Sequence, residues 1–335
     1  MFDEVSGEGR LATVFGGSGF VGRHIVHALA REGWRVRVAV RRPDLAGFLQ
    51  PIGGVGQVQS VQANLRYPDS VTRAIVGADV VVNATGIAAE SGRQNFEAVH
   101  IFGSKAIASA AAQAGVSALV HISGLGADSH SASRYIASKG RAEEEMRTAF
   151  PATTILRPSV VFGPEDDFLN RFAGLARFLP ILPLFGGGGT KLQPVYVGDV
   201  ALAVRAALND AAAAGKTFEL GGPAVVTLRE AVQMVLKIAQ RRRALLPLPF
   251  GVSRILAQTT EIASALTLGL FPHALTTTRD QIDLLMTDNV VGAQAKAEGR
   301  DLPGLGIAPK AIGDVAASYL YRFRKTGQFA GAVTG

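Results

Sequence analysis

Tyr135 and Lys139 lie four positions apart in a segment, residues 133–148, that is predicted to be a helix. Side chains at this spacing share one face of a helix, about one turn apart. The lysine can lower the pKa of the phenol and hold a ribose hydroxyl, and a tyrosine tuned in this way can transfer the proton that accompanies hydride transfer. Ser123 follows a predicted strand at 118–122, where its hydroxyl can hydrogen-bond a substrate oxygen. If the chain is an enzyme, these three residues are its predicted catalytic set.

A glycine series that begins at Gly16 is the second group with chemical meaning. It lies between an apolar run at 11–15, which predicts a buried strand, and a helical pattern over 20–32. Gly16 permits a sharp turn, Gly19 lets a pyrophosphate approach the backbone, and Gly22 lets the helix pack closely on the strand. The helix N-terminus then offers free N–H groups to phosphates. The pattern predicts a dinucleotide-binding turn, against the alternative of a glycine-rich turn without a ligand. Its predicted contacts are Gly16, Ser18, Gly19, Phe20, Val21 and Gly22.

Two arginines stand where the choice between NAD and NADP is usually made. A second predicted strand, at 35–40, is followed by Arg41 and Arg42. Proteins that prefer NAD usually carry Asp or Glu at this place, where it binds the ribose 2′-hydroxyl. A guanidinium group instead binds phosphate through a planar fork. The sequence therefore predicts NADP(H), with Arg41 and Arg42 near the 2′-phosphate, unless one of them simply faces solvent.

Strands and helices alternate regularly from residue 10 to residue 163. Such alternation is typical of a parallel sheet with helices on both faces. With the glycine turn, it predicts an α/β fold, a Rossmann-type doubly wound parallel sheet with a smaller C-terminal α-rich region. We expect a dinucleotide-binding domain at 1–165 and a second region at 166–335, from which strand and helix elements return to the sheet. Thr85-Gly86 follows a predicted strand and lies where open α/β sheets bind ligands.

Residues 244–270 differ from the rest of the chain. They are rich in Leu, Pro, Phe and Ala, and three arginines precede them. One interpretation is an amphipathic helical segment that lies on a membrane surface or a partner protein. The alternative is a cap packed on the chain's own sheet. Pro247, Arg254 and Glu261 interrupt the segment, so it is not expected to cross a bilayer.

Composition excludes several classes of function. At 48% hydrophobic and 18% charged residues, the 335-residue chain can bury a large core. The absence of cysteine excludes disulfides, thiol catalysis and cysteine-bound metals, and the six histidines lack the spacing of metal ligands. The net charge of +7 is spread along the chain without a nucleic-acid motif. We expect no bound metal and no nucleic-acid partner. The acidic N-terminus resembles neither a signal nor a transit peptide, which predicts a cytoplasmic, bacterial protein that is not secreted.

The motifs together resemble the short-chain dehydrogenase/reductase superfamily in its extended or atypical branch. The glycines match the family's glycine motif, and Ser123, Tyr135 and Lys139 match its Ser, Tyr and Lys. The resemblance covers roughly residues 10–220. It implies further cofactor contacts beside the adenine, beneath the cofactor and beside the nicotinamide. These residues are Asn64, Leu65, Ala84, Thr85, Gly86, Pro158 and Val160, and the resemblance adds Ser123, Tyr135 and Lys139.

A narrower resemblance spans nearly the whole chain. Residues 131–135, 158–164, 279–291 and 302–307 look like the nucleotide-binding accessory subunit of respiratory complex I (NADH:quinone oxidoreductase) and its bacterial relatives. This resemblance implies an NADPH-binding, non-catalytic subunit that stabilises assembly on the peripheral arm near the membrane. Its expected partners are peripheral-arm subunits, with possible membrane-surface contact, on the cytoplasmic face of the bacterial inner membrane.

Three hypotheses about function follow. The first is the complex I accessory subunit with tightly bound NADPH, which the apolar segment favours. The second is an NADPH-dependent reductase, epimerase or dehydratase of the same superfamily, which the complete Ser, Tyr and Lys set favours. The third is a regulator that senses the NADP(H) redox ratio, and no specific residue supports it. The retained set does not decide between the first two, because Tyr135 and Lys139 also hold the nicotinamide ribose in this superfamily.

Overall fold

The computed structural model describes residues 9–266, 279–325 and 327, and the chain forms two compact units. The first unit comprises the described residues within Met1–Pro158, Val197–Leu220 and Gly292–Ala308. The second comprises those within Ser159–Tyr196, Gly221–Val291 and Pro309–Gly335. Two later segments thus belong to the first unit. The sequence pattern predicted a boundary near residue 165, with later strand and helix elements returning to the sheet.

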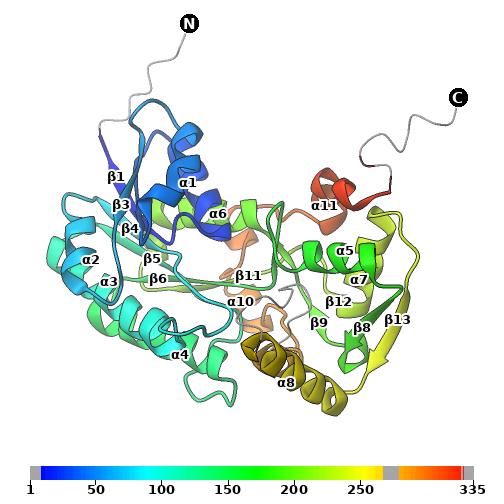
Figure 1. The fold of residues 1–335 in the computed structure, drawn as a ribbon. Coiled ribbons are helices and arrows are strands. Elements are labelled where there is room, and N and C mark those ends of the chain that lie inside the picture. The colour runs from blue at the N-terminus through cyan, green and yellow to red at the C-terminus, as the bar shows by residue number, and fades with distance from the viewer. Residues whose placement is uncertain (1–8, 267–278, 326, 328–335) are drawn as a thin grey trace, which may run out of the picture. The chain divides into compact units, whose positions relative to one another are not determined.

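A seven-stranded parallel sheet forms the centre of the first unit (Figure 1). Its strand order is β11-β6-β5-β4-β1-β2-β3. The strands are β1 (Leu11–Phe15), β2 (Arg35–Val40), β3 (Val58–Gln62), β4 (Val80–Asn83), β5 (Ala118–Ile122), β6 (Thr154–Pro158) and β11 (Thr217–Leu220). The order reverses between β1 and β4, which is where doubly wound sheets open a crevice for a ligand. The predicted Rossmann-type fold is confirmed.

Helices cover the two faces of this sheet (Figure 1). Helices α2 (Pro68–Ile75), α3 (Gly103–Ala114) and α4 (Arg134–Ala149) pack on one face, and α1 (Phe20–Arg31) packs with α6 (Val197–Asn209). Ile107 of α3 and Met146 of α4 are fully buried against Phe15, Val81 and Leu119 of the sheet. The remaining turns and short helices of the unit are η1 (Pro43–Ile52), η2 (Glu97–Phe102), η4 (Ala211–Ala213), α10 (Ala293–Ala297) and η6 (Pro303–Leu305).

The segment before β5 is not one uniform α-helix, although the sequence of residues 95–114 is typical of a single long helix. The structure instead has a π-helical turn, η2, ahead of α3. Such wide turns insert a residue into a helix and occur frequently at functional sites. Here the turn carries His100, which is buried against α4.

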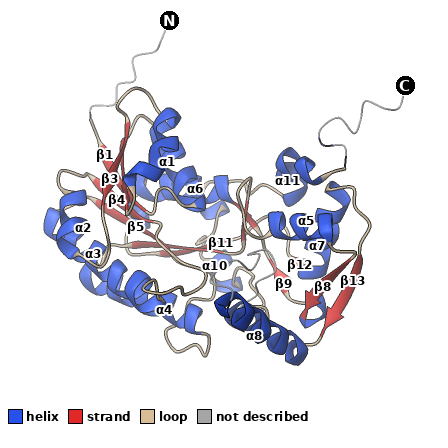
Figure 2. Cartoon of the chain, in the orientation of Figure 1, coloured by secondary structure: helices blue, strands red, loops and turns tan. Residues whose placement is uncertain are grey.

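The second unit combines short strand pairs with helices (Figure 2). Its strand pairs are β7 (Val161–Phe162) with β10 (Val195–Tyr196), β8 (Ile181–Phe185) with β13 (Ala244–Leu248), and β9 (Lys191–Leu192) with β12 (Val226–Thr227). Its helices and turns are α5 (Leu169–Phe178), η3 (Gly186–Gly188), α7 (Leu228–Ile238), α8 (Phe250–Leu266), α9 (Arg279–Leu284), α11 (Ile312–Leu320) and η7 (Tyr321–Phe323). Apolar side chains of α5, α7 and α11 form its core.

The segment predicted as an amphipathic helix is only partly helical. Residues 244–248 form strand β13, which pairs in parallel with β8, and α8 begins at Phe250. Residues 267–270 lie outside the described residues. Ala257 of α8 is fully buried, whereas Val252 and Ile255 are 51% and 65% exposed, so over residues 250–259 the helix is covered on one side and exposed on another. Among the described helices, none has both the length and the apolar character needed to span a bilayer.

Candidate functional site

The glycine turn between β1 and α1 has the geometry that its spacing predicted. Gly16 has a φ of +74°, a conformation that favours glycine, and an added Cβ would lie 2.7 Å from the Ala84 carbonyl oxygen. A Cβ on Gly22 would lie 2.2 Å from the Gly16 carbonyl oxygen, so α1 packs against the turn itself. At Gly19, a Cβ would meet only that same oxygen, at 3.2 Å. Gly16 and Gly22 are thus required by the fold, while Gly19 leaves its backbone open.

A cavity of about 250 Å³ opens beside this turn, where β1, β2, β3 and β4 end. It contains nine of the predicted cofactor residues: Gly16, Ser18, Gly19, Arg41, Asn64, Leu65, Ala84, Thr85 and Gly86. The remaining lining residues were not predicted: Phe15, Ala39, Val40, Ala63, Arg66, Ile87, Arg93, Gln94, Ala98 and Val99. The structure therefore brings the ends of four strands around one cavity.

Other predicted contact residues do not line this cavity. Phe20, Val21 and Gly22 begin α1 next to it. Pro158 ends β6 of the first unit, and its carbonyl oxygen accepts a hydrogen bond from the Leu125 amide at 2.9 Å. Val160 belongs to the second unit, where it packs against an apolar cluster.

The two arginines after β2 are in different situations. Arg41 lines the cavity. Arg42 does not, and its guanidinium donates to both carboxylate oxygens of Asp44, the shorter contact being 2.7 Å. The Asp44 hydrogen bond and charge raise the pKa of Arg42. Of the predicted pair, only Arg41 lines the cavity, while Arg42 forms an exposed ion pair with Asp44.

Three arginines line the cavity. Arg66 and Arg93 join Arg41 there, and the described residues of the lining include no Asp or Glu. None of the three makes an ion pair with a carboxylate in the described part of the chain. Arg66 directly follows Leu65, a signal that was visible in the sequence. Arg93 lies in a loop, and only the tertiary structure brings it to the cavity. The site is built for a ligand with several negative charges.

Ser123 is committed to an internal hydrogen bond. Its hydroxyl donates to Oε1 of Glu143 at 2.5 Å, and Glu143 is 1% exposed. Arg157 binds the same carboxylate with two parallel hydrogen bonds, Nε to Oε1 at 2.9 Å and Nη2 to Oε2 at 2.7 Å. A hydroxyl has a single hydrogen to donate. In this arrangement Ser123 cannot also donate to a substrate oxygen, as its predicted catalytic role requires.

The electrostatics around Tyr135 also differ from the prediction. Burial raises the pKa of Tyr135, whereas the lysine was expected to lower it. Lys139 Nζ lies 5.9 Å from the centre of the Tyr135 ring, over its face. Burial lowers the pKa of Lys139 to about 8, although the Glu143 carboxylate opposes the shift. The two side chains do share one face of α4, but the phenol is not tuned toward neutral pH.

One face of α4 carries a continuous polar row toward the sheet. Tyr135, Lys139, Glu143 and Arg147 follow one another at intervals of four residues. Lys139 and Glu143 are buried, and Arg147 Nη1 lies 3.8 Å from Glu143 Oε2. Glu143 was not predicted from the sequence, although its position four residues after Lys139 was the available signal. Its carboxylate holds Ser123 in place and contributes a negative charge near Lys139.

His100 links the cavity loop to α4. Its Nε2 accepts a hydrogen bond from the Ile87 amide at 3.0 Å, so in the neutral ring Nδ1 carries the hydrogen. Nδ1 lies 2.8 Å from Ser138 Oγ, which itself donates to the Tyr135 carbonyl. Burial and the nearby Lys139 charge lower the pKa of His100 to about 2. The imidazole is therefore a neutral structural link, and the described residues contain no cluster of three or more potential metal ligands.

Comparisons with known proteins agree with this geometry. Residues 16–167 match the family described as NAD(P)H-binding. Over 322 residues the chain is 35% identical to NADH dehydrogenase [ubiquinone] 1 alpha subcomplex subunit 9, mitochondrial, of Arabidopsis thaliana, with 95% of this chain and 79% of that protein covered. It is 34% identical to ceramide reductase of Caulobacter vibrioides, over 57% of this chain and 58% of that protein. Among solved structures, Pal from Bacillus thuringiensis is similar in fold, with a TM-score of 0.70, 16% identity, and 94% and 100% of the two chains covered.

Proposed function

Because the chain belongs to the family of NADH dehydrogenase 1 alpha subcomplex subunit 9, we propose that it is an NADPH-binding, non-catalytic accessory subunit of respiratory complex I. In this role it stabilises assembly of the complex on the peripheral arm near the membrane. The non-catalytic role is supported by the hydrogen bond from Ser123 to Glu143, because this bond uses the single hydrogen that the Ser123 hydroxyl can donate. The raised pKa of Tyr135 supports it, because burial makes the phenol a weaker proton donor and harder to deprotonate.

The charge of the cavity supports NADPH over NADH. A dinucleotide brings a pyrophosphate, and NADPH adds a 2′-phosphate on the adenine ribose. Three arginines without a neighbouring carboxylate suit this distribution of charge. Arg41 follows β2, the strand whose end normally selects between the two cofactors. We infer that Arg41 binds the 2′-phosphate and that Arg42, paired with Asp44, contributes less.

The second unit offers a surface for attachment to the complex. Leu246, Val252, Ile255 and Leu256 are between 40% and 65% exposed. Clusters of exposed apolar side chains of this kind mark protein or membrane contacts. We infer that this surface binds peripheral-arm subunits and contacts the membrane surface, on the cytoplasmic face of a bacterial inner membrane. The exposed Arg242 would suit acidic side chains or lipid phosphates there.

A second candidate is an NADPH-dependent reductase, epimerase or dehydratase that uses Ser123, Tyr135 and Lys139. Two observations favour it: the three residues are retained, and a relative of part of the chain is named ceramide reductase. Catalysis would require the Ser123 hydroxyl to leave Glu143 when substrate binds. The two candidates therefore differ in what removal of the Tyr135 hydroxyl does.

The test uses Tyr135→Phe in the organism that makes the protein. If the subunit is non-catalytic, the variant retains complex I assembly and NADH:quinone activity. In parallel, Val252→Glu with Ile255→Glu should release the chain from the membrane fraction, while Val55→Glu, at a fully exposed position of the first unit, should not. A wild-type chain that is wholly soluble and turns over NADPH, with activity lost in Tyr135→Phe, would favour the reductase.

A further inference from the structure

The loop that follows β4 ends in a tight hairpin whose tip is Gly92-Arg93. Ser91 and Gln94 exchange two backbone hydrogen bonds, of 2.9 and 3.0 Å. Gly92 has a φ of +54°, and Arg93 does not have a positive φ. A two-residue hairpin turn with glycine at its first position has a backbone twist that matches the flanking strands, and it fixes the backbone of its second residue. The backbone of Arg93 is therefore fixed by local structure.

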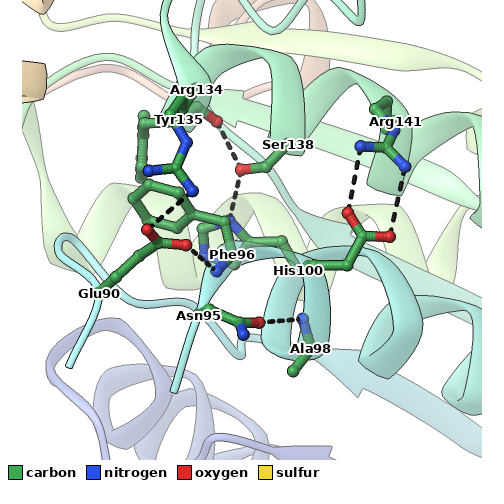
Figure 3. A network of polar contacts seen from close by, with 10 residues as sticks. Glu90, Asn95, Phe96, Ala98, His100, Arg134, Tyr135, Ser138 and Arg141 are labelled. Carbon is green, nitrogen blue, oxygen red and sulfur yellow. Dashed lines mark hydrogen bonds and ion pairs between the residues drawn. The ribbon is translucent and has the colours of Figure 1, made fainter. Parts of the chain in front are cut away.

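Glu90 fastens the base of this hairpin with both of its carboxylate oxygens. Oε1 accepts a hydrogen bond from the Phe96 amide at 2.9 Å, on the other side of the hairpin. Oε2 lies 2.9 Å from Nη2 of Arg134, the first residue of α4. Figure 3 shows Glu90 reaching both partners, with the Tyr135 ring nearby. The ring centres of Phe96 and Tyr135 are 5.7 Å apart in an edge-to-face arrangement.

Two further contacts tie the segment after the hairpin to α4. His100 contacts Ser138, and Glu97 accepts two hydrogen bonds from Arg141, at 3.1 and 3.3 Å (Figure 3). Arg134, Ser138 and Arg141 are spaced by four and three residues, so they share one face of α4. The loop is thus attached at three successive points, and Glu90–Arg134 is the point nearest to the hairpin tip in the sequence.

The hairpin tip contributes a cation to the cavity. Arg93 and Gln94 line it together with Arg41, Arg66 and the glycine turn. We propose that Arg93 binds a phosphate of the dinucleotide, and that Glu90 positions it by closing the hairpin and pairing with Arg134. This assignment rests on the proposed NADPH-binding function and adds to it a ligand residue and its support. The phosphate is the pyrophosphate or the 2′-phosphate, since a guanidinium fork suits both.

Calorimetric titration of the purified full chain with NADPH and NADH tests the assignment. Arg93→Gln should weaken NADPH binding by about 10-fold or more, the effect expected for loss of a hydrogen bond to a charged group. Arg73→Gln is the matched control, because Arg73 is exposed on α2 and lies outside the cavity lining. The control should bind within about 2-fold of the wild type. If Arg93→Gln weakens the binding of NADPH alone, Arg93 binds the 2′-phosphate. If it weakens the binding of NADPH and NADH equally, Arg93 binds the pyrophosphate.

The positioning role of Glu90 is tested by the rate of NADPH release, followed by stopped-flow fluorescence. Glu90→Gln keeps an acceptor for the Phe96 amide and loses the charge that pairs with Arg134, while Glu90→Ala loses both. Release should therefore be faster in Glu90→Ala than in Glu90→Gln, and faster in both than in the wild type. The melting temperature of both Glu90 variants without ligand should equal that of the wild type. A lower melting temperature would instead indicate a general loss of structure.

The outcomes separate this assignment from the function on which it rests. If Arg93→Gln binds NADPH as the wild type does while Arg41→Gln does not, Arg93 is no ligand and the assignment is overturned. Release rates in the two Glu90 variants that equal the wild-type rate would overturn the positioning role. A wild-type chain that binds neither cofactor would refute the proposed function itself.

Discussion

Ser123 donates its hydroxyl hydrogen to the buried carboxylate of Glu143 across 2.5 Å. The serine follows β5 and the glutamate lies 20 residues later on α4, so the contact joins the sheet to the helix. Arg157, in β6, completes it as an ion pair. The hydroxyl that the sequence predicted to contact a substrate is here buried and hydrogen-bonded within the protein.

The first prediction concerns this buried ion pair. Glu143→Ala removes the carboxylate and leaves Arg157 and Ser123 without their acceptor, and breaking a buried pair in this way costs about 3–5 kcal/mol of unfolding free energy. Ser123→Ala removes one donor and should cost only about 1–2 kcal/mol. Urea unfolding of both variants measures the difference. If the two cost the same, Glu143 does not organise this part of the core.

The second prediction distinguishes the adjacent arginines. Arg41→Gln should weaken NADPH binding by about 10- to 100-fold, because a charged hydrogen bond contributes about 1.5–3 kcal/mol. Arg42→Gln removes the same charge from a residue that Asp44 already neutralises, so its effect should be clearly smaller. Calorimetry with NADPH and NADH gives all four affinities. Equal affinity of the wild type for both cofactors would contradict the NADP(H) preference.

The third prediction separates the glycines of the turn. Gly22→Ala places a Cβ 2.2 Å from a backbone oxygen and should cost about 1–3 kcal/mol in the absence of any ligand. Gly19→Ala meets one atom at 3.2 Å and should cost about 1 kcal/mol or less.

The same pair of variants tests the stabilising effect of the cofactor. NADPH at a hundredfold excess over Kd should stabilise the wild type by about 2.7 kcal/mol. Gly19→Ala should lose most of this gain, because its methyl group faces the approaching pyrophosphate. Thermal unfolding with and without NADPH measures it, and full stabilisation of Gly19→Ala would show that the phosphates do not approach there.

The fourth prediction concerns pH. Burial and the charges of Lys139 and Arg147 lower the pKa of His121 to about 3, and neither ring nitrogen makes a hydrogen bond of good geometry with a described residue. In the unfolded chain a histidine takes up a proton near pH 6.5. The unfolded state therefore binds more protons between pH 6.5 and 3, and stability falls as pH is lowered through this range. The loss should be about 2 kcal/mol per buried histidine between pH 6.5 and 5.

A variant without this titration serves as the control for the pH prediction. His121→Leu replaces an imidazole without good hydrogen bonds by an apolar side chain, so it should be neutral or stabilising at pH 7. Its unfolding free energy should decline less steeply with acid than that of the wild type, while His100 still titrates. Urea unfolding at pH 7 and pH 5 measures both quantities, and parallel declines would exclude His121 as a source of acid sensitivity.

The amino-acid sequence by itself determined the fold class and the centre of the site. The turn from β1 to α1 depends on residues close together in the sequence, because the positive φ of Gly16 and the approach of Gly22 to the Gly16 carbonyl are both local requirements. Strand and helix periodicity are local in the same sense, so the parallel sheet was predictable. The spacing of Tyr135 and Lys139 likewise placed them on one face of α4.

The tertiary structure decided what those residues contact. Glu143 meets Ser123 only because folding brings α4 to the end of β5, and that contact occupies the hydrogen of the hydroxyl that the sequence predicted for catalysis. Burial raises the pKa of Tyr135, whereas the spacing of Tyr135 and Lys139 predicted a lowered pKa. Burial could not be predicted from the local sequence pattern. Arg93 reaches the cavity from a loop that is held in place by the ion pair between Glu90 and Arg134, two residues 44 positions apart in the sequence. Side-chain spacing is set by the chain, but partners and burial depend on elements that only folding brings together.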